Sequence, residues 1–188
     1  MKFKTTLILI CIAFLFSCKK ENNTSNPDIV HQNLNLKISA TSFLFDTAVL
    51  INFDNNASND FFLRMRYSTL RGVSHDLFFA SDDSRNQWLV YEDGEDAIAS
   101  LLAENTTIDS TSDIWGSSGI LYRKYLTLIN FTDAVGAGDI IVGVRFIMDA
   151  EYHYGWIKLS VSSDFKTVTV KEYAYRNTPN KAIKAGEY

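Results

Sequence analysis

The chain has 188 residues with 22 acidic and 18 basic side chains, a formal net charge of −4, and aromatic residues at 13% of its length. The excess of acidic over scattered basic residues argues against a nucleic-acid partner and against binding to an anionic lipid surface. Both cysteines, Cys11 and Cys18, lie in the first 18 residues. The rest of the chain therefore has no disulfide, thiolate metal site or cysteine nucleophile.

The first 18 residues resemble the signal sequence of a bacterial lipoprotein. Lys2 and Lys4 precede an apolar stretch at 7–16, which is too short to cross a bilayer as a helix and has the length of a signal-peptide hydrophobic region. The four residues that end at Cys18, Leu-Phe-Ser-Cys, resemble a lipobox. The resemblance implies that residues 1–17 are removed and that Cys18 receives acyl chains such as palmitate. The protein is then anchored in the outer membrane, at the periplasmic face or at the cell surface.

Two other interpretations of this segment are a secreted protein cleaved at an ordinary small-residue site and an inner-membrane helix.

Residues 19–28 are polar and lack apolar periodicity. We therefore expect residues 18–33, including His31, to be the lipidated cysteine and a flexible tether. Residues 34–188 are then one folded domain. Loss of Lys2 and Lys4 with the leader changes the net charge from −4 to −6.

The domain is predicted to be all-β, because Thr, Val, Ile and aromatic residues are plentiful and proline is nearly absent. The predicted strands cover residues 34–40, 43–53, 61–70, 76–81, 87–92, 120–125, 125–131, 140–148, 156–162 and 166–175. One short helix is expected at 95–104, where Ile98, Leu101 and Leu102 would share a face. About ten strands at this spacing indicate an antiparallel β-sandwich or jelly roll.

The C-terminal third contains an ordered series of short motifs. They are Val-Gly-Val-Arg-Phe at 142–146, His-Tyr-Gly-Trp at 153–156, Ala-Tyr at 174–175, Pro179, and Ala-Gly at 185–186. The series resembles the tail of exported bacterial β-sandwich proteins of unknown function, many of which end in a cell-surface sorting signal. The resemblance implies export and a β-sandwich, and it implies no chemistry. Within it, Gly155 indicates a bulge or a close backbone approach inside a strand.

The first candidate site is a loop rich in oxygen-bearing side chains. Asp54, Asn56, Ser58 and Asp60 occupy alternate positions, and Ca²⁺ prefers about six to eight oxygen ligands. Calcium is therefore the candidate cofactor, although Met65 stands where an EF-hand loop has its twelfth-position acid. The alternative is a turn between two strands that Asn and Asp side chains hold together.

Aromatic and histidine side chains form the second candidate site. Trp115 lies in a loop-like stretch, where its ring can stack on a sugar, and His153 and Trp156 lie in the tail motif. For all three, a structural role in the core is the alternative to ligand binding. His153, like His75, has no second histidine at a metal-ligand spacing.

The sequence shows no catalytic motif. Asp149 and Glu151 have the spacing of two carboxylates on one strand face, but they fall in a predicted turn. No nucleophile elbow and no phosphate-binding glycine loop occurs. The favoured function is a lipid-anchored, non-enzymatic binding or interaction module of the cell envelope, with a polysaccharide or an envelope protein as partner. The alternatives are a carbohydrate-active enzyme of the glycoside hydrolase type and a purely structural envelope protein.

Overall fold

The computed structural model describes residues 26–39, 47–66, 73–125, 138–164 and 166–188. In these ranges the regular secondary structure consists of fourteen β-strands, with no helix. They are β1 (Ile29–Ser39), β2 (Thr47–Ile51), β3 (Phe61–Arg66), β4 (Val73–Ala80), β5 (Gln87–Asp93), β6 (Asp96–Ala99), β7 (Leu101–Leu102), β8 (Thr107–Ile108), β9 (Ile114–Gly116), β10 (Ser118–Tyr125), β11 (Asp139–Met148), β12 (Glu151–Val161), β13 (Thr167–Arg176) and β14 (Ile183–Lys184).

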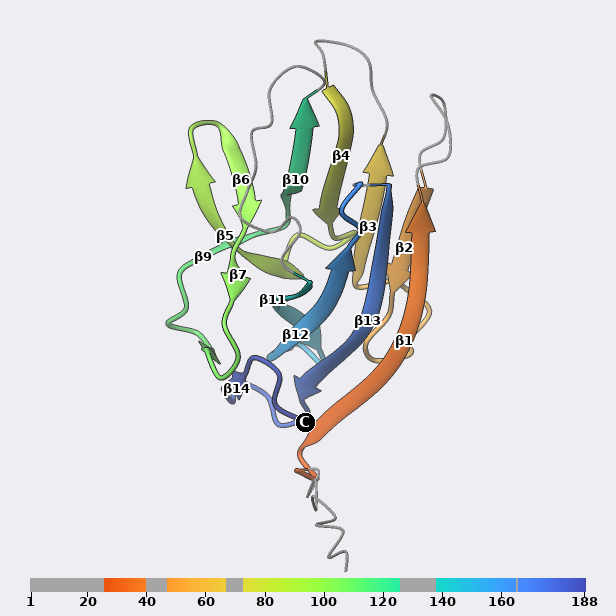
Figure 1. The fold of residues 1–188 in the computed structure, drawn as a ribbon. Helices are drawn as coiled ribbons and strands as arrows, with labels where there is room; N and C mark the ends of the chain where they lie inside the picture. The colour runs from red at the N-terminus through yellow and green to blue at the C-terminus, as the bar shows by residue number, and fades with distance from the viewer. Residues whose placement is uncertain (1–25, 40–46, 67–72, 126–137, 165) are drawn as a thin grey trace, which may run out of the picture.

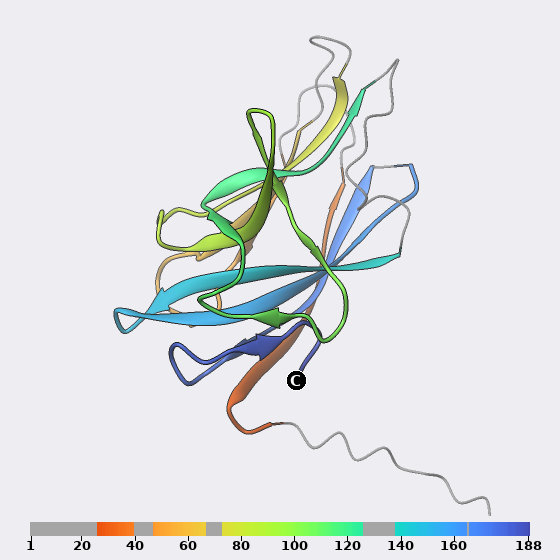
Figure 2. The ribbon, with the colours of Figure 1, turned by 90° about the vertical axis from the view of Figure 1, so that its left-hand side faces the viewer.

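Twelve of the strands form one sheet, and β8 and β14 form a separate antiparallel pair. The main order is β1-β13-β12-β11-β5-β6-β10-β4-β3-β2, with β7 beside β11 and β9 beside β5. The two end strands, β1 and β2, lie next to each other, so the sheet curls into a nearly closed, barrel-like sandwich (Figure 1). In Figure 2 strands β11–β13 run at a clear angle to β4 and β10. The predicted all-β, sandwich-like fold is confirmed.

The prediction of a helix at 95–104 is wrong. These residues form β6 and β7 instead, because their apolar side chains find partners on two different strands. Ile98 pairs with Ile120 of β10, while Leu101 and Leu102 pair with β11. Three apolar residues at helical spacing are too few to outweigh these sheet contacts. Five of the fourteen strands, β6 to β9 and β14, have four residues or fewer and are not among the predicted strands. The other nine correspond to predicted strands, and the tenth, predicted at 125–131, lies outside the described residues except for residue 125.

The tether ends earlier than expected, since β1 begins at Ile29 rather than at residue 34. His31, which we placed in the tether, pairs with Ala174 of β13. Asp28 fixes the place where the chain enters the sheet. Its carboxylate accepts hydrogen bonds from the Thr178 backbone N–H at 2.9 Å and from the Thr178 hydroxyl at 2.5 Å. The chain therefore enters the sheet beside the end of β13, close to the C-terminus (Figure 1).

The inner faces of the sheet enclose the main core. Alternate residues of β3 point inward, so Phe61, Leu63 and Met65 are fully buried. Aromatic rings fill the centre: Phe53 stacks on Tyr173 with ring centroids 4.2 Å apart and meets Phe146 edge-on at 5.0 Å. Such pairs add to the burial of apolar area, which is the main source of stability in a domain without disulfides.

A second, smaller core lies on the outer face of β11–β13. Tyr154, Trp156, Ile141 and Ala174 would be exposed there if the sheet were bare, but Ile108 of β8 and the residues of the C-terminal tail, Ile183 and Ala185, cover them. A Cβ added to Gly155 would lie 2.6 Å from the Ala174 carbonyl oxygen. The close backbone approach predicted at Gly155 is therefore confirmed. Residues of three of the C-terminal motifs thus pack against one another, namely Tyr154 and Trp156, Ala174, and Ala185.

Candidate functional site

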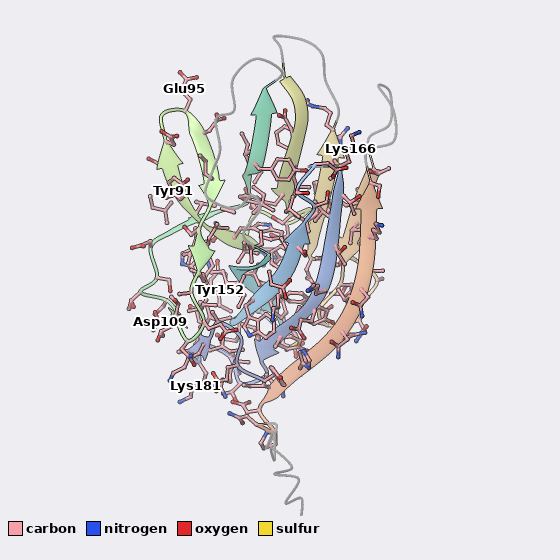
Figure 3. The ribbon with its side chains drawn as sticks, in the orientation of Figure 1. Tyr91, Glu95, Asp109, Tyr152, Lys166 and Lys181 are labelled. Atoms are coloured by element: carbon pink, nitrogen blue, oxygen red, sulfur yellow. The ribbon has the colours of Figure 1, made fainter. Side chains whose placement is uncertain are left out.

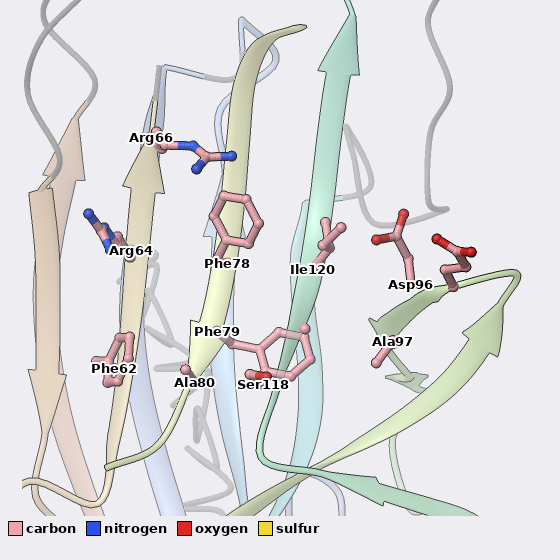
Figure 4. Close-up of a pocket in the computed structure, with 12 residues that line it drawn as sticks. Phe62, Arg64, Arg66, Phe78, Phe79, Ala80, Asp96, Ala97, Ser118 and Ile120 are labelled. Atoms are coloured by element: carbon pink, nitrogen blue, oxygen red, sulfur yellow. The ribbon is translucent and has the colours of Figure 1, made fainter. Parts of the chain in front are cut away.

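A groove of about 510 Å³ lies on the outer face of β3, β4, β10 and β6 (Figure 4). It has the size of sites that hold small ligands, which measure about 300–1,000 Å³. Its lining residues are Phe62, Arg64, Arg66, Phe78, Phe79, Ala80, Glu95, Asp96, Ala97, Ser118, Gly119 and Ile120.

The groove is hollow because a row of residues across four strands has small side chains in its middle. Phe62 pairs with Ala80, and Ala80 pairs with Ser118. Ile120 pairs with Ile98 in the parallel β6–β10 ladder, which places Ser118 level with Asp96. Ala80 and Ser118 form a low floor between the larger side chains of Phe62 and Asp96.

Gly119 brings β6 close enough to form one wall. A Cβ at this position would lie 2.4 Å from the Ala97 carbonyl oxygen and 2.5 Å from the Phe79 ring. Any larger residue would push β6 and its hairpin away from β10. The wall that carries Glu95 and Asp96 therefore depends on this glycine.

The opposite wall is basic and partly aromatic. The Arg66 guanidinium carbon lies 4.8 Å from the centroid of the Phe78 ring, and Nη2 lies 3.2 Å from a carboxylate oxygen of the buried Asp76. Both contacts hold the arginine over its neighbouring strand. Arg64 precedes Arg66 on the same outer face of β3. Figure 4 shows Arg66 and the Asp96 carboxylate on opposite sides of the groove.

The charges of the two walls decide what chemistry this groove can support. Glycoside hydrolases place two carboxyl groups on either side of the scissile bond. Here both carboxylates, Glu95 and Asp96, come from the β5–β6 turn and β6, whereas the arginines that line the groove, Arg64 and Arg66, come from β3. The arrangement suits holding and orienting a ligand better than cleaving one.

The loop predicted as a calcium site has the geometry of the alternative, a hydrogen-bonded turn. The Asp54 carboxylate accepts from the backbone N–H of Asn56 at 3.0 Å and from its side-chain amide at 2.7 Å. The Asn56 amide oxygen in turn accepts from the backbone N–H of Ser58 at 2.7 Å and from its hydroxyl at 2.8 Å. Among the described residues, no group of three or more His, Cys, Asp or Glu side chains is placed to hold a metal.

Asp60, the fourth residue of that loop, turns into the protein. One of its carboxylate oxygens accepts from the Phe53 N–H at 2.7 Å, and the other accepts from the Asn86 side-chain amide at 3.1 Å. The Asn86 oxygen accepts from the Ile147 N–H at 2.9 Å. Burial raises the pKa of Asp60 to about 6, with nearby Asp54 adding to the rise and the Phe53 and Asn86 hydrogen bonds opposing it. Asp60 thus joins two loops to β11.

Two of the predicted ligand residues, Trp156 and His153, lie in the core, as the structural alternative expects. Trp156 is 0% exposed, and its indole Nε1 donates to the Glu187 carbonyl oxygen at 3.0 Å. His153 is 3% exposed, with Nδ1 2.9 Å from the Arg176 carbonyl oxygen and its ring beside Phe146. Neither ring has a face at the surface for a sugar.

Trp115, the third of these residues, is half-buried and one face of its ring is occupied. The Arg145 guanidinium carbon lies 4.7 Å from the Trp115 ring centroid and also 4.7 Å from that of Tyr152. The arginine is therefore sandwiched between two aromatic rings, and its Nε donates to the Gln87 side-chain oxygen at 2.7 Å. Trp115 lies on β9 and is not among the residues that line the groove, so the structure does not combine them into one site.

The remaining candidates are dispersed. Asp149 and Ala150 form the two-residue turn between β11 and β12 with φ angles of 52° and 66°. Glu151 follows and accepts a 2.8 Å hydrogen bond from the Asn180 side chain. The carboxylates at 149 and 151 are thus exposed at a hairpin end. Cys18 and its signal sequence lie outside the described residues, as does the side chain of His75.

Sequence reasoning missed the groove. The alternation of β3 places Arg64 and Arg66 on an outer face, which is the usual fate of such residues, and Glu95 and Asp96 resembled the start of a helix. The informative signal was the pairing of Ala80 with Ser118, 38 positions apart, and only the strand order reveals that pairing.

Comparisons of the chain with protein families, with curated proteins and with solved structures find no match. In the described part of the chain, no helix has the length and apolar character needed to span a bilayer. The fold and the groove are therefore the basis for any functional conclusion.

Proposed function

We propose that this protein is a lipid-anchored envelope protein that binds a ligand in the groove between β3 and β6 without altering it chemically. The observation that carries the proposal is the low floor of Ala80 and Ser118 between two charged walls. The volume of the groove, about 510 Å³, lies within the range of small-ligand sites, which supports binding over a purely structural role.

The position of the groove supports this proposal. Glu95, on its rim, lies at the opposite end of the molecule from Lys181 (Figure 3). Lys181 follows shortly after Thr178, which holds Asp28 at the chain entry. An anchor at Cys18 would therefore attach to the end remote from Glu95, and the groove would face away from the membrane. Outer-membrane anchoring through Cys18 is part of the same proposal.

A polysaccharide end is the ligand class that we propose for this groove. Phe62 is half-buried at one end of the floor and offers an apolar ring face, while the exposed Ser118 offers a hydroxyl that both donates and accepts. The second candidate, a glycoside hydrolase, is favoured only by the carboxylates of Glu95 and Asp96, and it would need a partner for them on the facing wall. A structural envelope protein is the third candidate.

The first experiment is a thermal-shift screen of the full chain in detergent, with a panel of bacterial and host polysaccharides, with Ca²⁺ and with chelator. A ligand at 100 times its dissociation constant adds about 2.7 kcal/mol to stability, which moves the melting midpoint by several degrees. The groove-filling variant Ser118→Phe is expected to lose the shift, whereas Ser110→Phe, on an exposed turn away from the groove, keeps it. Product formation from a bound glycan would favour the hydrolase, and a flat panel would favour the structural role.

A further inference from the structure

An apolar surface leads out of the groove on the β3 side. Leu50 of β2 pairs with Phe62 of β3, so the two side chains stand next to each other on the outer face of the sheet. Leu50 alternates with the buried Val49 and Ile51 and is 55% exposed. A single exposed leucine is common on protein surfaces, but Leu50 adjoins a residue that lines the groove. The apolar lining therefore extends beyond the groove itself.

The same cross-strand line becomes more polar in the other direction. Phe62 pairs with Ala80 of β4, and Ala80 pairs with Ser118 of β10, whose side chain is exposed. Figure 4 shows these three residues across the floor of the groove. Strands β2 and β10 are three places apart in the sheet, which corresponds to about 14 Å between their backbones. A small ligand that follows this line meets an apolar end at Leu50 and a hydroxyl at Ser118.

Building on the proposed function, we propose that the saccharide bound in the groove carries an apolar substituent, such as an aryl or acyl group. The sugar ring lies over Ala80 with one hydroxyl bonded to Ser118, and the substituent lies against Phe62 and Leu50. The Ser118 hydroxyl both donates and accepts, which suits a sugar hydroxyl. Contact between the substituent and the two apolar side chains removes apolar surface from water, which adds affinity.

Other occupants use this line less fully. Leu50 and Phe62 together offer about 400 Å² even when fully exposed, whereas a stable protein interface buries about 800 Å² on each partner. The apolar area is therefore too small to favour a protein. A saccharide without an apolar group fits the floor at Ala80 and Ser118 but leaves Leu50 in water. An amphipathic saccharide is complementary to both ends.

The test compares the methyl and phenyl glycosides of glucose, galactose, mannose and N-acetylglucosamine. The full chain is held in phosphatidylcholine nanodiscs, because detergent monomers would compete for Leu50. Titration calorimetry gives a dissociation constant for each glycoside. For a sugar that binds, the phenyl glycoside is expected to bind at least about tenfold more tightly than the methyl glycoside, since one aromatic ring leaves water.

Two variants separate the two ends of the line. Leu50→Ser is expected to lower the preference for the phenyl glycoside at least about threefold, while the affinity for the methyl glycoside stays the same. Ser118→Ala is expected to weaken both glycosides by a similar factor and so to keep the preference. Ile114→Ser is the matched control, since Ile114 is 47% exposed but lies on β9, outside the groove lining. Melting curves of the free variants report whether each one is folded.

The outcomes that would overturn the inference are distinguishable. Equal affinity for methyl and phenyl glycosides, lost in Ser118→Phe, leaves groove binding intact but refutes the apolar substituent. A phenyl preference that survives Leu50→Ser, or that Ile114→Ser lowers equally, refutes the role of Leu50. Affinities unchanged by Ser118→Phe refute the proposed site and the inference with it. If none of the eight glycosides binds, the inference fails, whereas a melting shift with a polysaccharide would still support the proposed function.

Discussion

Trp156 donates a 3.0 Å hydrogen bond from its indole Nε1 to the backbone carbonyl oxygen of Glu187. The two residues are 31 positions apart, and the bond ties the last residues of the chain to the outer face of β12. Trp156 is fully buried, so its N–H needs a partner within the protein. The Glu187 carboxylate also accepts from the Lys184 backbone N–H at 2.9 Å, which holds the tail in its turn.

Replacing Ile183 with alanine tests whether the tail is part of the core. Ile183 is 1% exposed and packs with Ile108 and Trp156 in the outer cluster. The substitution removes buried methyl groups and is expected to lower the free energy of unfolding by about 2–5 kcal/mol. Lys184→Ala, the next residue but exposed, should change it by less than about 0.5 kcal/mol. If urea denaturation gave the same loss of unfolding free energy for both variants, the tail would not contribute to the hydrophobic core.

Gly155→Ala tests the close approach of β12 and β13. The new methyl group would lie 2.6 Å from the Ala174 carbonyl oxygen, which belongs to backbone that cannot move without disturbing the ladder. We expect a loss of about 1–3 kcal/mol in the free energy of unfolding. Gly143→Ala is the matched control, because its nearest neighbour is the flexible end of Leu102 at 3.2 Å. A cost for Gly143→Ala as large as that for Gly155→Ala would contradict the explanation.

These two sites show which parts of the fold the sequence predicts. Alternation and composition predict most long strands, and Gly155 predicts a close approach, since such signals are local. The helix expected at 95–104 fails because Ile98 and Leu101 have partners on β10 and β11, far along the chain. The groove could not be predicted for the same reason: its floor is formed by Ala80 and Ser118, which are far apart in the sequence and meet only through strand pairing.

The buried carboxyl group of Asp60 should make stability depend on pH. Its pKa is about 6 in the folded protein and near 3.8 when unfolded, so the folded state binds the proton more tightly. The free energy of unfolding should therefore fall as the pH rises from about 4 to above 6, by at most about 3 kcal/mol from this group.

Asp60→Asn isolates this effect, because the amide oxygen can still accept from the Phe53 N–H. The variant is expected to lose stability overall, since its NH₂ faces the Asn86 amide donor. The stability advantage of the natural protein over the variant should be larger at pH 4 than at pH 7. Asp164→Asn is the control and should show almost no trend between pH 4 and 7, because hydrogen bonds from Ser162 and Lys166 lower the pKa of Asp164 below its ordinary value of 3.8. An advantage that is constant between pH 4 and 7 would refute the role of Asp60.

The last prediction concerns Arg145, which lies between the rings of Trp115 and Tyr152. Two guanidinium nitrogens, Nε and Nη2, donate to the Gln87 side-chain oxygen. Arg145→Lys keeps the charge but loses the flat group that fits between two rings and the two-pronged hydrogen bond. We expect a loss of about 1–2 kcal/mol in the free energy of unfolding, with a change in tryptophan fluorescence as Trp115 is uncovered.

Arg85→Lys provides the comparison for this variant. Arg85 also pairs through its guanidinium, with Asp83 at 2.6 Å, but its side chain is 61% exposed and its partner lies in the same turn. Exposed pairs of this kind contribute little, so its replacement should leave the free energy of unfolding nearly unchanged. If both variants behave alike, Arg145 is an ordinary surface charge. If Arg145→Lys costs more, the aromatic sandwich holds β9 against β11, and Trp115 is a structural residue rather than a ligand platform.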